Sequence, residues 1–289
     1  MIKIKYFYKK NMISHRVRTL LISFVFLASN LIAQNSRFAY EYTFIPDSTD
    51  IKSKRSEIMI LDIMKNKSEF YSLDRMKLDS VRVEDHKKKI FKPYQLEKEM
   101  ISDRVIKYSD NNDIDYITFV GTNRFLVKDD RKLTWKLLPE FSTILDFKVQ
   151  KATVTFAGRK WIAWFSAEIP IQDGPYKFKG LPGLILRIED DKAQHIFELK
   201  SIGKFTQDFV YPGTDYYQAP PKISYLQYVQ AFNNFRKNPI ADLIGKIQDQ
   251  PDKNGKMRTA NEILKEIENK EKEKMKKENN IIEIDLLKK

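Results

Sequence analysis

The chain has 289 residues, of which 42% are hydrophobic and none is cysteine. The lack of cysteine excludes disulfides, thiolate catalysis, thiolate metal sites and the acylated cysteine of a lipoprotein. The formal net charge is +13, but six of the positive charges lie in the first 33 residues, which leaves +7 on the following 256.

The first 33 residues have the three parts of a secretory signal peptide. A basic stretch ends at Arg18, an apolar run follows from Leu20 to Ala33, and Gln34 begins a polar segment. The apolar run is shorter than the roughly twenty residues that span a bilayer. We therefore expect cleavage near Ala33 and export to the periplasm or beyond. The released protein should be soluble, with at most peripheral membrane contact and no nucleic-acid partner.

Residues 34–222 are predicted to form an antiparallel β domain. Tyr40 and Tyr42 belong to a strand of alternating aromatic residues at 37–45, and strands at 57–63 and 69–73 follow as a hairpin. The charged stretch 74–102 is expected to be an exposed helix or an excursion. Short strands at 105–108, 116–120, 125–127 and 133–137 predict a meander. Two more pairs, 149–156 with 160–169 and 184–189 with 195–202, complete a mainly β fold.

The predicted sheet is a curved antiparallel meander or half-open barrel, because strongly twisted sheets of many strands curl. Its shape is similar to periplasmic lipoprotein-carrier folds, as an analogy of architecture alone. Residues 223–289 are predicted to be helical and to pack on the sheet or extend from it. Ser224 and Thr259 are the expected helix N-caps, and the second helix, rich in Lys and Glu, should face solvent.

The most distinctive run spans residues 173–186 and contains Gly180-Leu181-Pro182-Gly183-Leu184-Ile185. Its Pro-Gly pair predicts a type II turn, because proline presets φ at the second turn position and glycine supplies positive φ at the third. Gly174 and Pro175 predict a second bend. The loop between these bends should fold over one end of the sheet, either as a packing corner or as a lid over a ligand groove.

This run, together with the hairpin at 149–165, resembles the signature of the GLPGLI family of exported proteins. The resemblance covers roughly residues 149–199 and implies an exported envelope protein of uncharacterised function, without accepted catalytic residues. Family members often carry a cysteine near Val149, which this chain lacks.

The sequence contains little that indicates catalysis. His86 and His195 are the only histidines after the leader and lack the spacing of a metal motif, so no metal is expected. The residue types of a Ser-His-Asp triad are present at Ser166, His195 and Asp173, but no G-x-S-x-G turn exposes a nucleophile. No phosphate-binding glycine loop is present, so we expect no nucleotide cofactor or other cofactor. A pair of carboxylates suited to hydrolysis remains open, because their separation is invisible in a sequence.

The first functional hypothesis is non-enzymatic binding of a lipid-like or peptide ligand, or of an envelope partner protein, on the concave face of the sheet. The expected rim or lid residues are Tyr176, Phe178, Leu181, Pro182, Trp161 and Trp164, and the expected turn residues are Gly174, Pro175, Gly180 and Gly183. The alternatives are a hydrolase of envelope polymers and an assembly module that uses the helix after Thr259. The assembly hypothesis expects the fold to survive deletion of residues 259–289.

Overall fold

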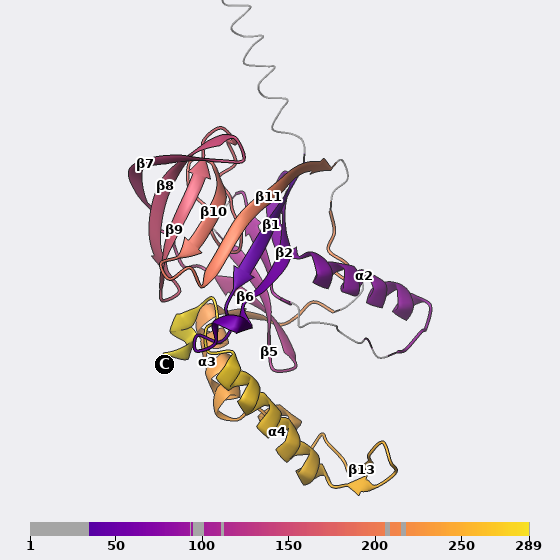
Figure 1. The fold of residues 1–289 in the computed structure, drawn as a ribbon. Coiled ribbons are helices and arrows are strands. Elements are labelled where there is room, and N and C mark those ends of the chain that lie inside the picture. Colours follow the sequence, from indigo (N-terminus) through magenta and orange to yellow (C-terminus); the bar gives the residue numbers. More distant parts are fainter. Residues whose placement is uncertain are drawn as a thin grey trace, which may run out of the picture.

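The computed structural model describes residues 35–92, 94, 101–110, 113–205, 209–214 and 218–288. Within them a 12-stranded sheet forms the centre of the molecule (Figure 1). Its strands are β1 (Asn35–Phe44), β2 (Arg55–Ile63), β3 (Lys67–Ser72), β4 (Arg104–Tyr108), β5 (Ile114–Val120), β6 (Asn123–Asp129), β7 (Lys136–Ile144), β8 (Phe147–Phe156), β9 (Arg159–Ser166), β10 (Leu184–Asp190), β11 (His195–Phe205) and β12 (Lys222–Ser224).

The remaining elements lie around this sheet. They are η1 (Ile51–Ser53), α2 (Leu73–Lys87), α3 (Tyr225–Lys237), η2 (Ala241–Leu243), the hairpin β13 (Gln250–Pro251) and β14 (Met257–Arg258), α4 (Ala260–Lys277) and η3 (Ile284–Leu287). Both expected N-caps are present, Ser224 before α3 and Thr259 before α4, and each forms a capping box. None of the helices in the described part of the chain is long and apolar enough to cross a membrane.

The sheet is open and almost entirely antiparallel, as predicted, and its order is β12-β6-β5-β4-β3-β2-β1-β11-β10-β9-β8-β7. Only β12 is parallel to its neighbour, β6, which makes the sheet mixed. The central strand β1 pairs with β2 on one side and with β11 on the other. The sheet therefore consists of two meanders that meet at β1.

The prediction that sequential strands stay adjacent is wrong between β6 and β7. β7 ends the strand order and β6 lies next to the opposite end, beside β12, yet only residues 130–135 connect them. A connection from Asp129 to Lys136 spans at most about 25 Å when fully extended. The sheet must therefore curl until its two ends approach each other. The expected turn at Asp129 does not form a hairpin, because this side chain is ion-paired in the interior.

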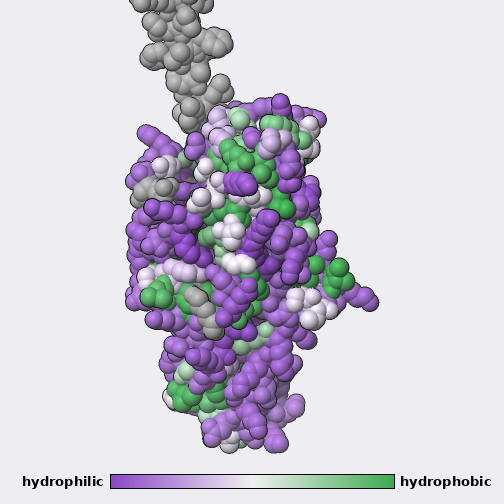
Figure 2. Space-filling model, turned by 90° about the vertical axis from the view of Figure 1, so that its left-hand side faces the viewer, coloured by the Kyte–Doolittle hydropathy of each residue, from purple (hydrophilic) through white to green (hydrophobic). Residues whose placement is uncertain are grey.

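The edge strand β7 also differs from the predicted strand at 133–137, since it begins at Lys136 and continues to Ile144. Pro139 lies in its middle, and a proline without an N–H is tolerated on an edge strand. The face around this edge is largely hydrophilic with separate hydrophobic patches (Figure 2). Exposed apolar side chains along β7 and its turn are Leu137, Phe141 and Leu145.

Alternation of side chains along the strands gives the sheet two apolar faces. On the inner face, Phe38, Tyr40 and Tyr42 of β1 are buried in the main core, as expected from their spacing. On the outer face, Ile60 and Tyr71 form a smaller cluster with Tyr211, and Met76 of α2 packs against it. The stretch 74–102 thus contains a helix that partly covers the outer face.

The loop between β9 and β10 turns more tightly at Pro182 than a type II turn does. The N–H of Gly183 donates to the carbonyl of Leu181 (2.8 Å), and the N–H of Leu184 donates to Ile169 (3.1 Å) instead of closing a four-residue turn. A Cβ on Gly183 would lie 2.0 Å from the carbonyl oxygen of Ser166. The glycine is required here because the loop passes directly against the end of β9.

We predict that Gly183→Ala destabilises the fold far more than Gly180→Ala. Both glycines have positive φ, but a Cβ on Gly180 would meet nothing within 4 Å. Gly180→Ala should therefore cost only the backbone strain of about 1–2 kcal/mol, whereas Gly183→Ala must also displace the backbone. Urea unfolding of the two variants measures the difference, and equal losses would contradict the argument from close approach.

Candidate functional site

A cavity of about 270 Å³ opens on the inner face of the sheet. Its walls come from the strands β1 to β4 and β11, from residues 101–103, and from the segment after α4. The apolar or aromatic residues that line it are Tyr42, Phe44, Pro46, Met59, Phe70, Ile101, Val105, Tyr176, Phe197, Ile281 and Ile282. Its polar and charged lining consists of Arg55, Ser102, Asp103, His195, Glu278 and Asn280. Most of the lining is thus hydrophobic.

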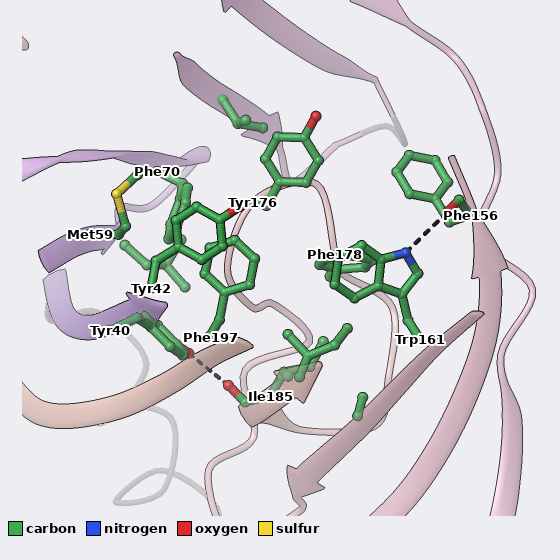
Figure 3. Packing of buried hydrophobic residues seen from close by; sticks show 14 of the residues in the cluster. Tyr40, Tyr42, Met59, Phe70, Phe156, Trp161, Tyr176, Phe178, Ile185 and Phe197 are labelled. Carbon is green, nitrogen blue, oxygen red and sulfur yellow. Dashed lines mark hydrogen bonds between the residues drawn. The ribbon is translucent and has the colours of Figure 1, made fainter. Parts of the chain in front are cut away.

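Stacked rings build the wall on the β1 side. Tyr42 lies parallel to Phe197 across the β1–β11 pair, with 4.0 Å between ring centroids, and stacks on Phe44 at 4.8 Å. Met59 and Phe70 from the next two strands lie beside them (Figure 3). Offset or parallel stacking holds each ring in one orientation, so the wall is preformed.

Asp103 is the carboxyl group at the edge of this apolar wall. It is half-buried and accepts hydrogen bonds from the hydroxyls of Tyr116 and Thr118, both 2.7 Å long. Removal from water raises the pKa of Asp103 above its usual value, although the two hydroxyls oppose this shift. The cavity therefore offers one strong hydrogen-bond acceptor that two donors hold in position.

His195 is buried, and both of its ring nitrogens have partners. The carbonyl of Asn280 lies 3.0 Å from Nε2 and accepts its proton, which leaves Nδ1 to accept from the hydroxyl of Tyr42 at 2.6 Å. Burial, reinforced by the charge of Arg159, lowers the pKa of His195 to about 3. The ring is neutral near neutral pH and has no free nitrogen with which to act as a base.

The depressed pKa of His195 makes stability depend on pH above the range where carboxylates titrate. In the unfolded chain this histidine gains a proton near pH 6.5, but in the folded protein it does so only near pH 3. The stabilisation is complete above pH 6.5 and is lost as the pH falls toward 3. Between pH 7 and pH 5 we predict a loss of about 2 kcal/mol in unfolding free energy. Urea titrations should show a smaller loss in His195→Gln, and an equal loss would refute this role.

The segment after α4 forms the remaining wall and is bound to the sheet by hydrogen bonds. Arg159 donates to the carbonyls of Ile281 (2.7 Å) and Ile282 (3.1 Å) and to the side chain of Asn280 (2.6 Å). The same arginine pairs with buried Asp190 at 2.9 Å. One side chain at the start of β9 thus positions three consecutive residues of the C-terminal segment.

The expectation that residues 259–289 could be removed without loss of the fold is contradicted by this arrangement. Three residues of this segment are buried, with exposed fractions of 4% for Asn280, 2% for Glu283 and 3% for Leu286. Their removal would expose apolar core and leave buried cations without partners. Charge alone suggested a detachable solvent-facing end, but that description fits only the outer face of α4.

A buried ionic cluster fixes the loop that carries Tyr176. The Nζ of Lys177, which is fully buried, lies 2.8 Å from Asp129 at the end of β6 and 2.5 Å from Glu283 beside η3. Arg131 pairs with the same two carboxylates at 2.6 and 2.8 Å. The hydroxyl of Tyr176 also donates to Glu283, at 2.7 Å. We call these four charged residues the ionic clamp.

Both acids of the ionic clamp are ionised in the folded protein. Burial alone would raise the pKa of Glu283, but the charges of Lys177 and Arg131 outweigh it and the pKa is lowered. The pKa of Asp129 is lowered as well, because the hydrogen bond from Arg131 and the charge of Lys177 outweigh burial. Removing one cation would leave desolvated negative charge behind.

We predict that Lys177→Met destabilises the protein by about 3–5 kcal/mol, the usual cost of breaking a buried ion pair. The methionine is an unbranched side chain only one atom shorter, so the loss reports mainly the missing charge. Lys160→Met, at an exposed position of β9, is the matched control and should change stability by less than about 0.5 kcal/mol. Chemical denaturation provides the comparison, and similar values for the two variants would show that the ionic clamp does not stabilise the fold.

The structure brings one of the six expected rim residues to the cavity. Tyr176 lines it, whereas Phe178, Leu181 and Trp161 are buried in the adjoining core at 0%, 1% and 0% exposure. Phe178 packs against Trp161 with centroids 4.8 Å apart (Figure 3). Such burial is what the packing-corner interpretation of the loop expects. A binding role for these three side chains stays a prediction.

The two other expected rim residues lie away from this core. Pro182 is exposed at the tip of the loop, and Trp164 is half-buried on the opposite face of β9 from Trp161. Of the expected turn residues, Gly174 and Pro175 are buried, while Gly180 is exposed. Gly174 lies against Ile185, where an added Cβ would come within 2.8 Å.

Ser166, His195 and Asp173 do not form a catalytic triad. His195 bonds to Tyr42 and Asn280 as described above, whereas Asp173 accepts a hydrogen bond from Ser68 at 2.5 Å. Asp173 is also ion-paired with Lys107, which is buried. Among the described residues no group of three or more His, Asp or Glu side chains could hold a metal ion. Two carboxylates, Asp103 and Glu278, border the cavity, so the hydrolase hypothesis stays open as a prediction.

Several residues of the site could not be singled out beforehand. Asp103 lies between the charged stretch 74–102 and the predicted strand at 105–108, and no role was predicted for it or for Lys177. A signal did exist for Lys177, because Tyr176 and Phe178 on either side predicted a buried loop. A lysine between two buried aromatic residues needs a buried carboxylate partner.

Comparison with known proteins gives limited information. A family model described as "Protein of unknown function (Porph_ging)" matches residues 157–187, which include Gly180 to Ile185. No curated protein matches the sequence. Two solved structures of PNGF-II, in the P21 and C2 space groups, are similar at a TM-score of 0.49 and 16% identity over 71% of this chain. The chain spans 34% of the length of each of those structures.

Proposed function

We propose that this chain is an exported, non-enzymatic binding protein that holds a small, mainly apolar ligand in the cavity of the inner face. The observation that supports this most directly is the preformed aromatic wall around about 270 Å³ of unfilled space. Protein interiors are normally packed without such voids. A lined cavity that the protein leaves open to the surface is therefore a candidate ligand site.

The size and lining of the cavity limit the ligand. Pockets for drug-sized molecules measure roughly 300–1,000 Å³, so this one suits a short acyl chain or a single aromatic group. Asp103 supplies an acceptor, so a hydroxyl or amide group on the ligand would find a partner there. A purely apolar molecule would remove water from this carboxylate without adding a donor to the hydroxyls of Tyr116 and Thr118.

The export component of the proposal rests on residues 1–33, which lie outside the described residues. The basic stretch, the short apolar run and the polar segment that follows are typical of a cleaved leader. The resemblance of residues 149–199 to the GLPGLI family of exported proteins points the same way. A net charge of +7 after cleavage would suit an envelope rich in anionic groups.

We predict that 1-octanol binds in this cavity and that Met59→Trp blocks it. Burying eight carbons at about 0.8 kcal/mol each gives a dissociation constant on the order of 10–100 µM as an upper limit of affinity. The indole of Met59→Trp would occupy the same space and should weaken binding at least tenfold. Isothermal titration calorimetry measures both values, and native mass spectrometry of the exported protein shows whether a small molecule copurifies.

The neighbouring residue Ile58 provides the control. It lies on β2 beside Met59 but points to the other face and is 38% exposed. Ile58→Trp should bind 1-octanol like the unmodified protein. Val105→Phe fills the cavity from β4 and provides a second test should Met59→Trp fold poorly. Equal binding by the filled variants and the control would place the ligand elsewhere and reject the proposal.

A further inference from the structure

A second cavity, of about 150 Å³, lies on the outer face of the sheet and is lined by four arginines. Arg75 and Arg82 come from α2, Arg104 from β4 and Arg124 from β6. Asp79 is the one carboxylate in its lining, and the other lining residues are Ser102, Ile117, Phe119, Tyr211 and Pro212. Four guanidinium groups from three separate elements thus meet in a small, partly apolar space.

Asp79 forms ion pairs with both arginines of α2. It lies 3.0 Å from Nε of Arg75 and 3.5 Å from Nη1 of Arg82, positions four residues before it and three residues after it on the helix. The hydroxyl of Tyr211 also donates to Asp79, at 3.0 Å. This carboxylate is therefore already surrounded by donors and is not available to the arginines of the sheet.

The two arginines of the sheet are incompletely paired. Arg104 is buried, and its Nε has no hydrogen-bond partner in the described part of the chain. That nitrogen forms only a long ion pair, at 3.8 Å, with one oxygen of Glu69, whose other oxygen accepts from Lys67 at 2.6 Å. The face of the Arg104 guanidinium lies 4.4 Å from the ring centroid of Tyr211. One terminal nitrogen of Arg104 donates to the hydroxyl of Thr214 at 3.3 Å, so stacking fixes a cation whose Nε makes no hydrogen bond.

Arg124 is half-buried and has no ion-pair or hydrogen-bond partner within the described ranges. Burial and the nearby positive charge of Arg104 lower its pKa below the ordinary arginine value. A cation held in this way costs stability, since burial and repulsion both oppose it. An anion in the cavity would relieve both.

We propose that this outer-face cavity binds an oxyanion of phosphate or sulfate size. Guanidinium groups pair in a forked geometry with carboxylates and phosphates. A carboxylate has two acceptor oxygens in one plane, whereas a tetrahedral oxyanion presents oxygens in several directions. The arginines approach from a helix and from two strands, which suits the tetrahedral group. The apolar side chains of Ile117 and Phe119 lower the local dielectric and strengthen each contact.

The test measures thermal unfolding and calorimetric binding of the purified protein with sodium phosphate, sodium sulfate and sodium chloride at equal ionic strength. Phosphate or sulfate should raise the unfolding midpoint more than chloride does. Arg124→Gln should weaken binding at least about tenfold, the effect of losing one charged hydrogen bond. Glycerol 3-phosphate distinguishes two possible ligands, a phosphate ester and the free phosphate ion. Tighter binding of glycerol 3-phosphate than of inorganic phosphate indicates an ester, and equal binding indicates the free ion.

Arg187→Gln is the matched control, because Arg187 is also half-buried in the sheet but pairs with Glu189 at 2.8 Å. It should bind the anion normally. Without anion, Arg124→Gln should be as stable as the unmodified protein or more so, whereas a structural arginine would lose stability. Arg82→Gln tests the contribution of α2 independently. The proposal is overturned if phosphate and sulfate act no differently from chloride, or if the Arg124 and Arg82 variants both bind like the control.

Discussion

The burial of Lys177 between Asp129 and Glu283 is the constraint on which the arrangement of this protein depends. The lysine belongs to the loop before β10, the aspartate ends β6, and the glutamate lies in the segment after α4. Each charge is unfavourable in the interior unless its partners are in place. The three segments must therefore adopt their positions together, which curls the sheet and brings Tyr176 and the C-terminal segment to the inner cavity.

Local pattern was sufficient to predict most individual elements. The alternation around Tyr40 and Tyr42 identified β1 and its buried face, because the side-chain period of a strand is two. The hairpin of β8 and β9 followed from Gly158, which has φ of 78° in the turn. Ser224 and Thr259 marked helix starts through hydrogen bonds within one turn. Each of these features is decided by residues that are close in sequence.

What could not be predicted depends on residues far apart in sequence. The position of β7 at the edge far from β6 follows from where the ionic clamp holds Asp129, and nothing near this residue in the sequence indicates that position. The tight turn at Gly183 is set by its contact with Ser166, and the inner cavity exists only where residues 101–103 and 280–282 approach the sheet. The sequence could have placed Arg75 and Arg82 together, since they are two helical turns apart on one face. Nothing in the sequence indicated that arginines of β4 and β6 would join them.

The tethering of residues 280–286 also affects the order in which the molecule can be assembled. These residues are synthesised after every strand they contact, yet they complete the hydrogen bonding of Arg159 and His195 and the charge balance of Lys177. During synthesis, a sheet that formed early would hold these cations and the imidazole with only some of their partners. The finished interior thus becomes favourable only once residues 280–286 have been made and have docked on the sheet.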